Sequence, residues 1–237
     1  MKISKALLTT LILVWAVSFD TSLLAQSQTR DVGKFTGVKM SVPGDLYVKQ
    51  GSSQKVVIEA ADDVLDRIET EVSGGNLVIR QKDDWKWWKN WSGRGKIKVY
   101  VTAPTLEYLV VSGSGSIESE NTLRSDNMYV GVSGSGEIDL DLDTGDLEGK
   151  VSGSGNVDLR GNADDIEISI SGSGNFDAEN LTANNCEVRI SGSGNCRVHV
   201  KESLESRVSG SGNIYYKGDP SKVNNSSSGS GSLRKIG

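Results

Sequence analysis

Ser171-Gly172-Ser173-Gly174 and Ser191-Gly192-Ser193-Gly194 are two of seven copies of a four-residue motif, and this motif decides the fold of the chain. The copies begin at Ser112, Ser133, Ser152, Ser171, Ser191, Ser209 and Ser228. Their spacing varies only between 18 and 21 residues. A flexible Gly/Ser linker has no such period, so each copy marks one unit of a repeat architecture.

Apolar residues stand at fixed odd offsets from the first serine of each motif. The position directly before it holds Val111, Val132, Val151, Ile170, Ile190 and Val208, and Ser227 breaks the rule. The position five residues after it holds Ile117, Ile138, Val157, Phe176, Cys196, Ile214 and Leu233. A period of two residues is typical of a strand with one buried face. Helix is excluded, because each of the paired glycines would cost about 1 kcal/mol in a helix interior.

The motif glycines share these odd, inward offsets, so the backbone can bend tightly there. The serines and the residue after the second glycine point outward, and in stacked rungs they form columns of hydroxyls and amides that can hydrogen-bond along the stack. Rungs stacked about 4.8 Å apart bury a continuous core that no single rung could bury. The sequence therefore predicts an all-β protein, a parallel β-helix (solenoid) with S-G-S-G rungs of about 19 residues. We expect it to be right-handed, as parallel crossovers nearly always are.

The segment 31–110 is irregular but carries degenerate copies of the same unit. Residues 38–48 align without a gap with residues 188–198, and residues 72–79 align after deletion of one serine. We expect the solenoid to begin near Phe35, and residues 31–110 and the S-G-S-G repeats of 111–237 to form one continuous domain. Terminal rungs should be atypical, because they cap a sheet edge that would otherwise recruit another strand.

The first 25 residues are typical of a signal peptide. Lys2 and Lys5 precede an apolar run at 6–17 that is too short for a permanent membrane span, and a cleavage point lies after Ala25. We expect an exported protein, located in the periplasm, at the outer-membrane surface or outside the cell. The mature chain would carry 24 basic and 30 acidic side chains, without the clustered basic excess of proteins that bind nucleic acid.

Side chains suited to catalysis are few. The only histidine, His199, falls at an outward offset typical of a surface residue, and no hydrolase, metalloprotease or P-loop motif is present in the sequence. Cys186 and Cys196 occupy apolar positions of the repeat, which favours buried thiols over a disulfide. The sequence therefore predicts a protein that is not an enzyme, with no catalytic residue, no cofactor and no metal site.

One acidic run resembles a calcium-binding loop in its alternation. It consists of Asp139, Asp141, Asp143 and Asp146. Gly145 stands one place late for an EF-hand, and Lys150 takes the place of the closing glutamate. The alternation with Leu140 and Leu142 indicates instead a strand with a polar outer side.

Several short segments follow one another in a specific order. They are residues 35–38, 56–60, 77–79, 97–106 and then the S-G-S-G series. In this order the chain resembles the putative auto-transporter adhesin family, also called the head GIN domain, of exported bacterial proteins. The resemblance covers nearly the whole mature sequence. It implies a right-handed β-helix in the cell envelope and an adhesive role, and it supplies no catalytic residues to carry over.

Four of the five tryptophans gather between strands predicted at 77–80 and 96–101. The candidate ligand-binding residues of this segment are Trp85, Trp87, Trp88, Trp91, Lys86, Lys89 and Arg94. Tryptophan rings stack on sugar rings, and the cations could meet acidic groups. The segment could instead cap the open N-terminal end of the solenoid or contact a membrane interface.

Three classes of function remain open. We expect an exported cell-envelope module for adhesion or glycan binding, with a cell-surface polysaccharide or an envelope protein as its partner. A purely structural or assembly component is the first alternative, with weak self-association through the C-terminal rung, which holds Leu233 and Ile236. A β-helix carbohydrate-active enzyme is the second. A hydrophobic open end would favour assembly, and an acidic pair on one face of neighbouring rungs would favour the enzyme.

Overall fold

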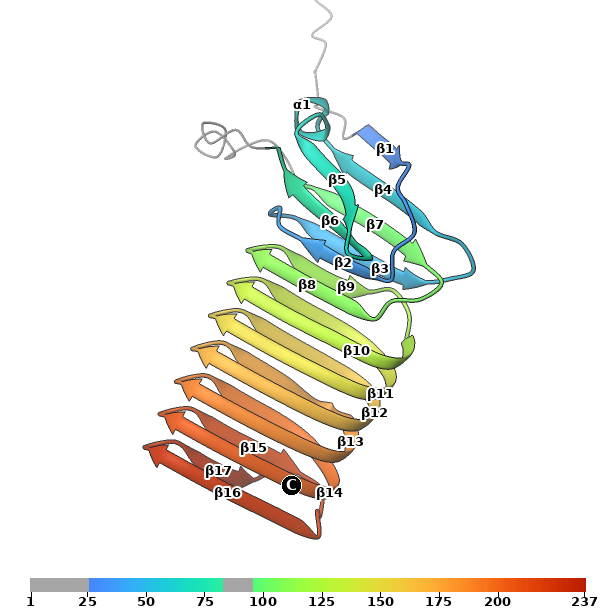
Figure 1. Cartoon of the computed structure of the whole chain (residues 1–237). Helices are drawn as coiled ribbons and strands as arrows, with labels where there is room; N and C mark the ends of the chain where they lie inside the picture. Colours follow the sequence, from blue (N-terminus) through green and yellow to red (C-terminus); the bar gives the residue numbers. More distant parts are fainter. Residues whose placement is uncertain (1–25, 83–95) are drawn as a thin grey trace, which may run out of the picture.

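Each S-G-S-G motif forms a sharp corner of a β-solenoid (Figure 1). The structure is a computed structural model and describes residues 26–82 and 96–237. The rungs that contain the motif are built from β8 (Tyr108–Gly113), β9 (Ser116–Ser119), β10 (Leu123–Gly134), β11 (Glu137–Gly153), β12 (Asn156–Gly172), β13 (Asn175–Gly192), β14 (Asn195–Gly210), β15 (Asn213–Lys217), β16 (Lys222–Gly229) and β17 (Ser232–Lys235). All of them pair in parallel with the neighbouring rungs. The all-β solenoid predicted from the sequence is therefore confirmed.

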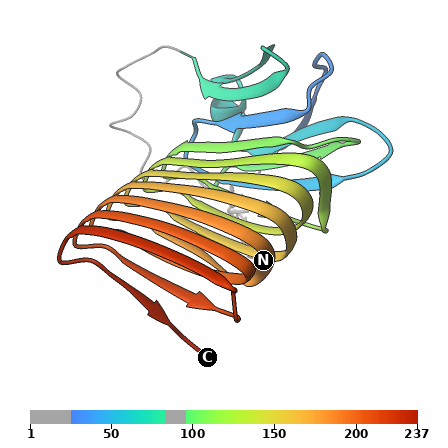
Figure 2. The ribbon, with the colours of Figure 1, turned by 60° about the horizontal axis from the view of Figure 1, so that its bottom comes forward.

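The motif sets the register of the stack. Ser133 pairs with Ser152, Ser152 with Ser171, and Ser171 with Ser191. Equivalent residues therefore lie one above another, and Figure 2 shows the rungs following one another as parallel loops.

Each rung has two strand faces and two corners. The S-G-S-G motif makes the sharp corner, and the chain turns back at a second, rounded corner (Figure 2). The four strands β11 to β14 cross this second corner without a break, which makes them 16 to 18 residues long.

The alternation predicted from the sequence separates core from surface in every rung but the last. Ile170 and Phe176 represent the two apolar positions, and both are buried, as is Leu204, which stands five residues before the motif of its rung. In the last rung the equivalent of Leu204 is Val223, which is 40% exposed, and Leu233 is only partly buried. The last rung therefore leaves part of its apolar surface uncovered within the described structure.

The two glycines of each motif are required for different reasons. Gly194, a second glycine, is buried, and a Cβ there would lie 2.4 Å from the carbonyl oxygen of Gly174 in the preceding rung. Gly192, a first glycine, is partly exposed, so the prediction that both glycines point inward is wrong for this one. Its φ is 126°, and a Cβ would lie 2.4 Å from the carbonyl oxygen of Gly172. Both positions exclude a side chain because the backbone of the neighbouring rung approaches so closely.

The residue after the second glycine forms a hydrogen-bonded ladder. Asn175 Nδ2 donates to Asn156 Oδ1 at 3.0 Å, and Asn195 Nδ2 donates to Asn175 Oδ1 at 3.2 Å. Asn213 continues the ladder at 3.3 Å, and Ser232 Oγ ends it at 2.8 Å. The predicted column of amides is confirmed. The motif serines differ, since their hydroxyls make no hydrogen bond to any described residue.

One rung precedes the S-G-S-G series. It is formed by β2 (Gly37–Met40) and β3 (Asp45–Gln50), which pair in parallel with β8 and β9. Asp45 pairs with Ser116, as the alignment of residues 38–48 with the later rungs predicts. The degenerate rung at 38–48 is therefore confirmed.

The second degenerate copy, at 72–79, is not a rung corner, and that prediction is wrong. β6 (Asn76–Gln81) stacks in parallel on β2, but it also forms an antiparallel hairpin with β5 (Ile68–Ser73). Gly74 and Gly75 join the two strands with φ values of 57° and 77°. Two successive residues with positive φ make a tight hairpin turn, so the chain reverses here instead of passing to the other face of a rung.

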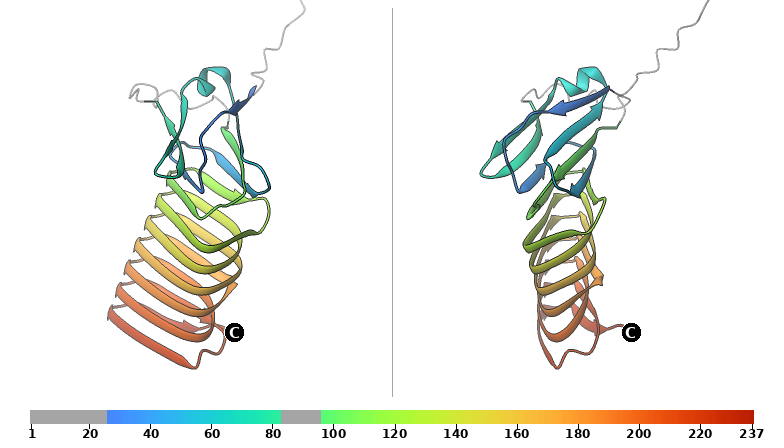
Figure 3. Two further views of the ribbon diagram at one scale, coloured as in Figure 1. Left: turned by 45° about the vertical axis from the view of Figure 1, so that its right-hand side comes forward. Right: turned by 90° about the vertical axis from the view of Figure 1, so that its right-hand side faces the viewer.

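Antiparallel elements close the N-terminal end. β7 (Lys98–Ala103) stacks on β3, β4 (Lys55–Ala60) pairs with β7, and β1 (Gln26–Arg30) pairs with β4. The short helix α1 (Asp62–Leu65) adds Val64 and Leu65 to the core. Figure 3 shows these elements gathered at one end of the stack. At the other end, within the described residues, β16 pairs with β14 alone.

Replacing Gly192 with valine should destabilise the fold by about 3 kcal/mol or more, because a branched side chain tolerates neither the positive φ nor the close carbonyl oxygen of Gly172. Ser193→Thr is the matched control, since Ser193 is exposed and the change should stay within about 0.5 kcal/mol. Thermal unfolding followed by circular dichroism measures both variants. Equal melting temperatures would contradict this corner geometry.

Candidate functional site

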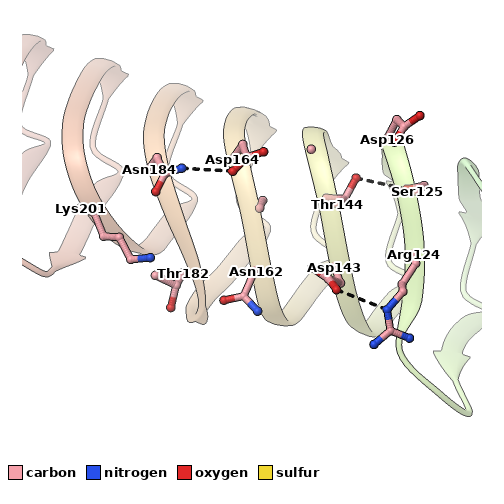
Figure 4. A pocket seen from close by; sticks show the side chains of 12 residues that line it. Arg124, Ser125, Asp126, Asp143, Thr144, Asn162, Asp164, Thr182, Asn184 and Lys201 are labelled. Atoms are coloured by element: carbon pink, nitrogen blue, oxygen red, sulfur yellow. Dashed lines mark hydrogen bonds and ion pairs between the residues drawn. The ribbon is translucent and has the colours of Figure 1, made fainter.

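A polar groove runs along the second corner of the solenoid (Figure 4). It crosses five rungs, β10 to β14, and has a volume of about 590 Å³. At the strand spacing of about 4.8 Å, five rungs make it about 19 Å long. We call this surface the corner groove. Its lining consists of Arg124, Ser125, Asp126, Asp143, Thr144, Gly145, Asn162, Ala163, Asp164, Thr182, Asn184 and Lys201.

Strand register and the turn at the corner place these side chains in rows. The first row consists of Arg124, Asp143, Asn162 and Thr182, each paired with the next in neighbouring rungs. The second row consists of Asp126, Gly145, Asp164 and Asn184. Between the rows lie Ser125, Thr144 and Ala163, whose small side chains keep the corner hollow. Every rung thus presents polar groups at the same place, although the residue types differ.

Some of these groups are held by their neighbours. Arg124 Nε lies 3.3 Å from Asp143 Oδ2, and Asn184 Nδ2 donates to Asp164 Oδ1 at 3.1 Å. These two contacts join side chains of adjacent rungs along the groove, as Figure 4 shows. They fix the walls of the groove at four positions.

Other groups keep their full hydrogen-bonding capacity. The side chains of Asp126, Asn162 and Lys201 make no hydrogen bond or ion pair with another residue that the structure describes. Asp126 and Lys201 lie near opposite ends of the groove, and Asn162 lies in the middle rung. A carboxylate only accepts, an ammonium only donates and an amide does both, so the groove offers both kinds of partner to a ligand.

The rungs around the groove are strongly acidic. From Glu107 to Cys196 the chain carries 17 acidic and 4 basic side chains, a net charge of −13. Residues 197–237 carry 3 acidic and 7 basic side chains, a net charge of +4. The two cations of the groove, Arg124 and Lys201, stand in its first and last rungs. The middle rungs of the groove therefore have a negative electrostatic potential that repels anions. Salt at 0.1 M screens this repulsion beyond about 10 Å.

Carboxylates also stack on the strand face that follows the S-G-S-G corner. Asp139, Asp158 and Asp177 pair in successive rungs. Arg160 Nη1 donates to Asp158 Oδ1 at 3.1 Å and also pairs with Asp139, while Arg197 Nη1 lies 3.2 Å from Asp177 Oδ2. Burial, together with the neighbouring carboxylates of Asp177 and Asp139, raises the pKa of Asp158. The arginines hold side chains in place that would otherwise repel one another.

The acidic run found in the sequence lies in β11. Leu140 and Leu142 are buried, and Asp139 and Asp141 both pair with Arg160. The interpretation as a strand with a polar outer side is confirmed. Within the described residues, no group of three or more His, Cys, Asp and Glu side chains could hold a metal ion.

Three further residues singled out in the sequence are partly or fully buried. His199 continues the first row beyond Thr182, and its Nδ1 lies 3.4 Å from Thr182 Oγ1. Burial, followed by the charges of Lys217 and Lys201, lowers the pKa of His199. Cys186 and Cys196 are buried free thiols, as predicted, and burial raises the pKa of both.

The predicted ligand-binding segment lies outside the described residues. It contains Trp85, Lys86, Trp87, Trp88, Lys89, Trp91 and Arg94. The strands predicted on either side of it are present as β6 and β7. The sequence pattern does not indicate the corner groove, because no residue type repeats along it. The only signal is that outward positions midway between two motifs are polar in every rung.

Comparison with known proteins identifies similar sequences and structures. A family model described as "Putative auto-transporter adhesin, head GIN domain" matches residues 34–220. The chain is 28% identical to a solved putative adhesin from Bacteroides fragilis, with a TM-score of 0.82 over 90% of this chain and 97% of that chain. No curated protein matches the chain.

Two further solved structures share the fold. One is a putative lipid binding protein from Parabacteroides distasonis, with 24% identity and a TM-score of 0.73. The other is a putative adhesin from Parabacteroides merdae, with 21% identity and a TM-score of 0.70. Both comparisons cover 90% of this chain and 97% of the other.

The stability of the fold should depend on the protonation of His199. Because its pKa is lowered in the folded chain from an ordinary value of 6.5, the unfolded chain binds the proton more readily. The contribution of neutral His199 to the free energy of unfolding is therefore fully present above pH 6.5 and is lost as the pH falls below that value. Urea unfolding of wild type and His199→Gln between about pH 8 and pH 5.5 should show a shallower loss in the variant. Identical slopes would exclude His199 as a source of this dependence.

Proposed function

Because the chain belongs to the putative auto-transporter adhesin, head GIN domain, family, we propose that it is an exported, non-catalytic adhesion module of the cell envelope. We propose that this module binds polysaccharide through the corner groove. The observation that carries this proposal is the repetition of polar positions across five rungs. A polysaccharide presents hydroxyl groups at a regular interval, so it can meet the same kind of partner at each step. The rungs supply those partners without any movement of the backbone.

The chemistry of the lining supports a ligand rich in hydroxyl groups. A sugar hydroxyl both donates and accepts, which suits Asp126, Asn162 and Lys201 together. Each such hydrogen bond contributes only about 0.5–1.5 kcal/mol net, so useful affinity needs contacts in several rungs. Aromatic stacking adds nothing among the described residues of the groove, since none of those that line it is aromatic. Tyr108 and Tyr129 stack on each other elsewhere, with ring centroids 4.7 Å apart.

The proposed location follows from the family and from the sequence. A family of adhesins supports an exported protein, and the signal peptide predicted at residues 1–25 lies outside the described residues. In the described part of the chain, no helix has the length and apolarity needed to cross a membrane. We propose that the protein is located in the periplasm, at the outer-membrane surface or outside the cell.

The stacked carboxylates of Asp139, Asp158 and Asp177 are the observation that favours an enzyme. A glycosidase needs one carboxyl group that donates a proton and a second that stays free to act as nucleophile or base. Here Arg160 and Arg197 pair with all three side chains. The three residues also lie outside the corner groove. The proposal is therefore a binding module and not a carbohydrate-active enzyme.

Filling the groove should reduce adhesion. Asn162→Arg places a long side chain in the middle rung and should lower retention of residues 26–237 on insoluble surface polysaccharide by about tenfold or more, equivalent to about 1.4 kcal/mol. Asn224→Arg is the matched control, because Asn224 is exposed on β16, is not among the residues that line the groove and receives the same charge. A pull-down with quantified bound protein measures both variants.

The outcomes separate the candidate sites. Equal loss in both variants, or in neither, would remove the corner groove as the binding site. Loss confined to Trp87→Ala and Trp88→Ala would assign binding to the tryptophan-rich segment. If the wild-type protein is not retained at all, the proposed function fails.

A second candidate function is assembly, which the last rung favours. Val223 is the only large hydrophobic side chain that is exposed in the described residues, and it stands on β16, which pairs on one side only. An unpaired strand with an apolar side chain can pair with a second copy. The cations Lys222 and Arg234 of the last rung would then approach those of the second copy and oppose the contact, whereas the charge of Lys235 is paired with Asp219.

Self-association through the last rung should therefore be weak and should increase with salt, because salt screens the repulsion between these cations. Sedimentation equilibrium at high protein concentration, in about 0.05 M and about 0.5 M NaCl, measures it. Val223→Lys should abolish the association, whereas Val110→Lys, on a strand paired on both sides, should leave it unchanged. A strict monomer in both salts would exclude this role.

A further inference from the structure

We propose that the corner groove selects an uncharged, extended β-1,4-linked glycan that lies along the solenoid axis with one sugar per rung. This inference rests on the proposed function and names the ligand class of the same site. Four observations carry it: the direction of the groove, the spacing of its polar positions, its charge and the lack of aromatic side chains among the described residues that line it.

The direction of the groove fixes how a polymer would lie. The first row, from Arg124 through Asp143 and Asn162 to Thr182, follows the pairing of strands from rung to rung. It therefore runs parallel to the stack and across the strands. A linear ligand in the groove must extend over about 19 Å to contact all five rungs.

The spacing of the rungs selects the linkage. A β-1,4-linked glycan is a nearly straight ribbon, and its rise per sugar is close to the strand spacing of about 4.8 Å. Successive sugars of this ribbon are turned by about half a revolution, so alternate sugars present the same edge to alternate rungs, and each rung still meets hydroxyl groups because both edges carry them. An α-1,4-linked glucan coils and leaves the groove after one or two sugars. Because the rungs of the groove are hydrogen-bonded to neighbouring rungs, a straight polymer should require little ordering of the protein.

The charge of the groove selects against acidic polymers. The middle three rungs contribute Asp143 and Asp164 and no cation, and they belong to a stretch with a net charge of −13. A glycan with a carboxylate on every sugar would place several anions in this field, within the screening length of about 10 Å. Neutral hexoses and N-acetylated amino sugars meet no such penalty. The groove therefore fits an uncharged polymer.

Because the described lining of the groove holds no aromatic side chain, the affinity should depend on the length of the ligand. A site that stacks sugars on tryptophan gains much of its affinity from one or two rings. The corner groove offers hydrogen bonds alone, distributed over five rungs. Each added sugar should therefore increase the affinity, on average about fivefold in the dissociation constant, until the rungs are used.

Isothermal titration calorimetry on residues 26–237 tests this inference with four probes. Two are the β-1,4-linked series of glucose and of N-acetylglucosamine, each from the disaccharide to the hexasaccharide, which distinguish the two sources of a neutral ribbon. The others are maltohexaose, which is neutral but α-linked, and hexagalacturonate, which is extended but anionic. We expect at least one β-1,4-linked series to bind on average about fivefold tighter per added sugar up to the pentasaccharide and then to level off. Maltohexaose and hexagalacturonate should bind at least tenfold more weakly than the best hexasaccharide.

Two variants assign the binding to the groove. Asn162→Ala should weaken the pentasaccharide several-fold, while Asn224→Ala should not. Neither side chain has a partner in the described structure, so both variants should keep the wild-type melting temperature. Equal affinities for the two variants would overturn the assignment.

The remaining outcomes separate this inference from the proposed function. Maltohexaose or hexagalacturonate binding as tightly as the β-1,4-linked hexasaccharides, with loss in Asn162→Ala, would overturn the selectivity and leave a glycan-binding groove. An affinity that does not change beyond the disaccharide would overturn the arrangement of one sugar per rung. If no oligosaccharide binds and surface polysaccharide is not retained, both proposals fail.

Discussion

The close contact between glycine backbones of successive S-G-S-G corners is the constraint on which the rest of the structure depends. The Gly172 carbonyl oxygen accepts backbone hydrogen bonds from Ser193 and Gly194 of the next rung, at 2.8 and 3.0 Å. The same pattern recurs along the stack. A side chain at the first glycine would clash with this carbonyl oxygen. A shifted register would place a residue other than glycine against it, so the rungs pair in one register only. That register places the apolar columns inside, the asparagine ladder outside and the two rows of the corner groove side by side.

The sequence predicts the structure best close to the motif. Residues within five positions of the first serine keep constant offsets, and both the buried columns and the asparagine ladder could be predicted from them. At a greater distance from the motif the pairing register changes. In the pair of β13 and β14, for example, it shifts between Ala178 and Thr182. The rungs differ in length by up to three residues, and the second corner absorbs the difference. The corner groove lies where no offset is constant, so an alignment on the motif cannot reveal it.

The N-terminal part shows how small a sequence change alters the outcome. Residues 72–79 differ from a regular rung by one missing serine, yet Gly74 and Gly75 form a hairpin turn and β5 pairs antiparallel to β6. A corner needs the intervening serine to carry the chain to the other face, and two adjacent glycines with positive φ return it along the same face. Local similarity to the motif therefore predicts burial of Leu77 and Ile79 correctly but gives the wrong chain direction.

Within the described residues the two ends of the stack are held differently, and this has a mechanical consequence for the proposed adhesion module. Antiparallel strands and α1 lock the N-terminal end, whereas β16 is held on one side and is exposed along its whole length. Since each rung is stabilised mainly by its neighbours, tension applied at the C-terminal end would peel rungs singly, starting with β16 and β17. Each released rung would lengthen the tether by about 60 Å. The molecule would thus unfold one rung at a time and dissipate mechanical work, while the rungs β10 to β13 keep most of the groove intact.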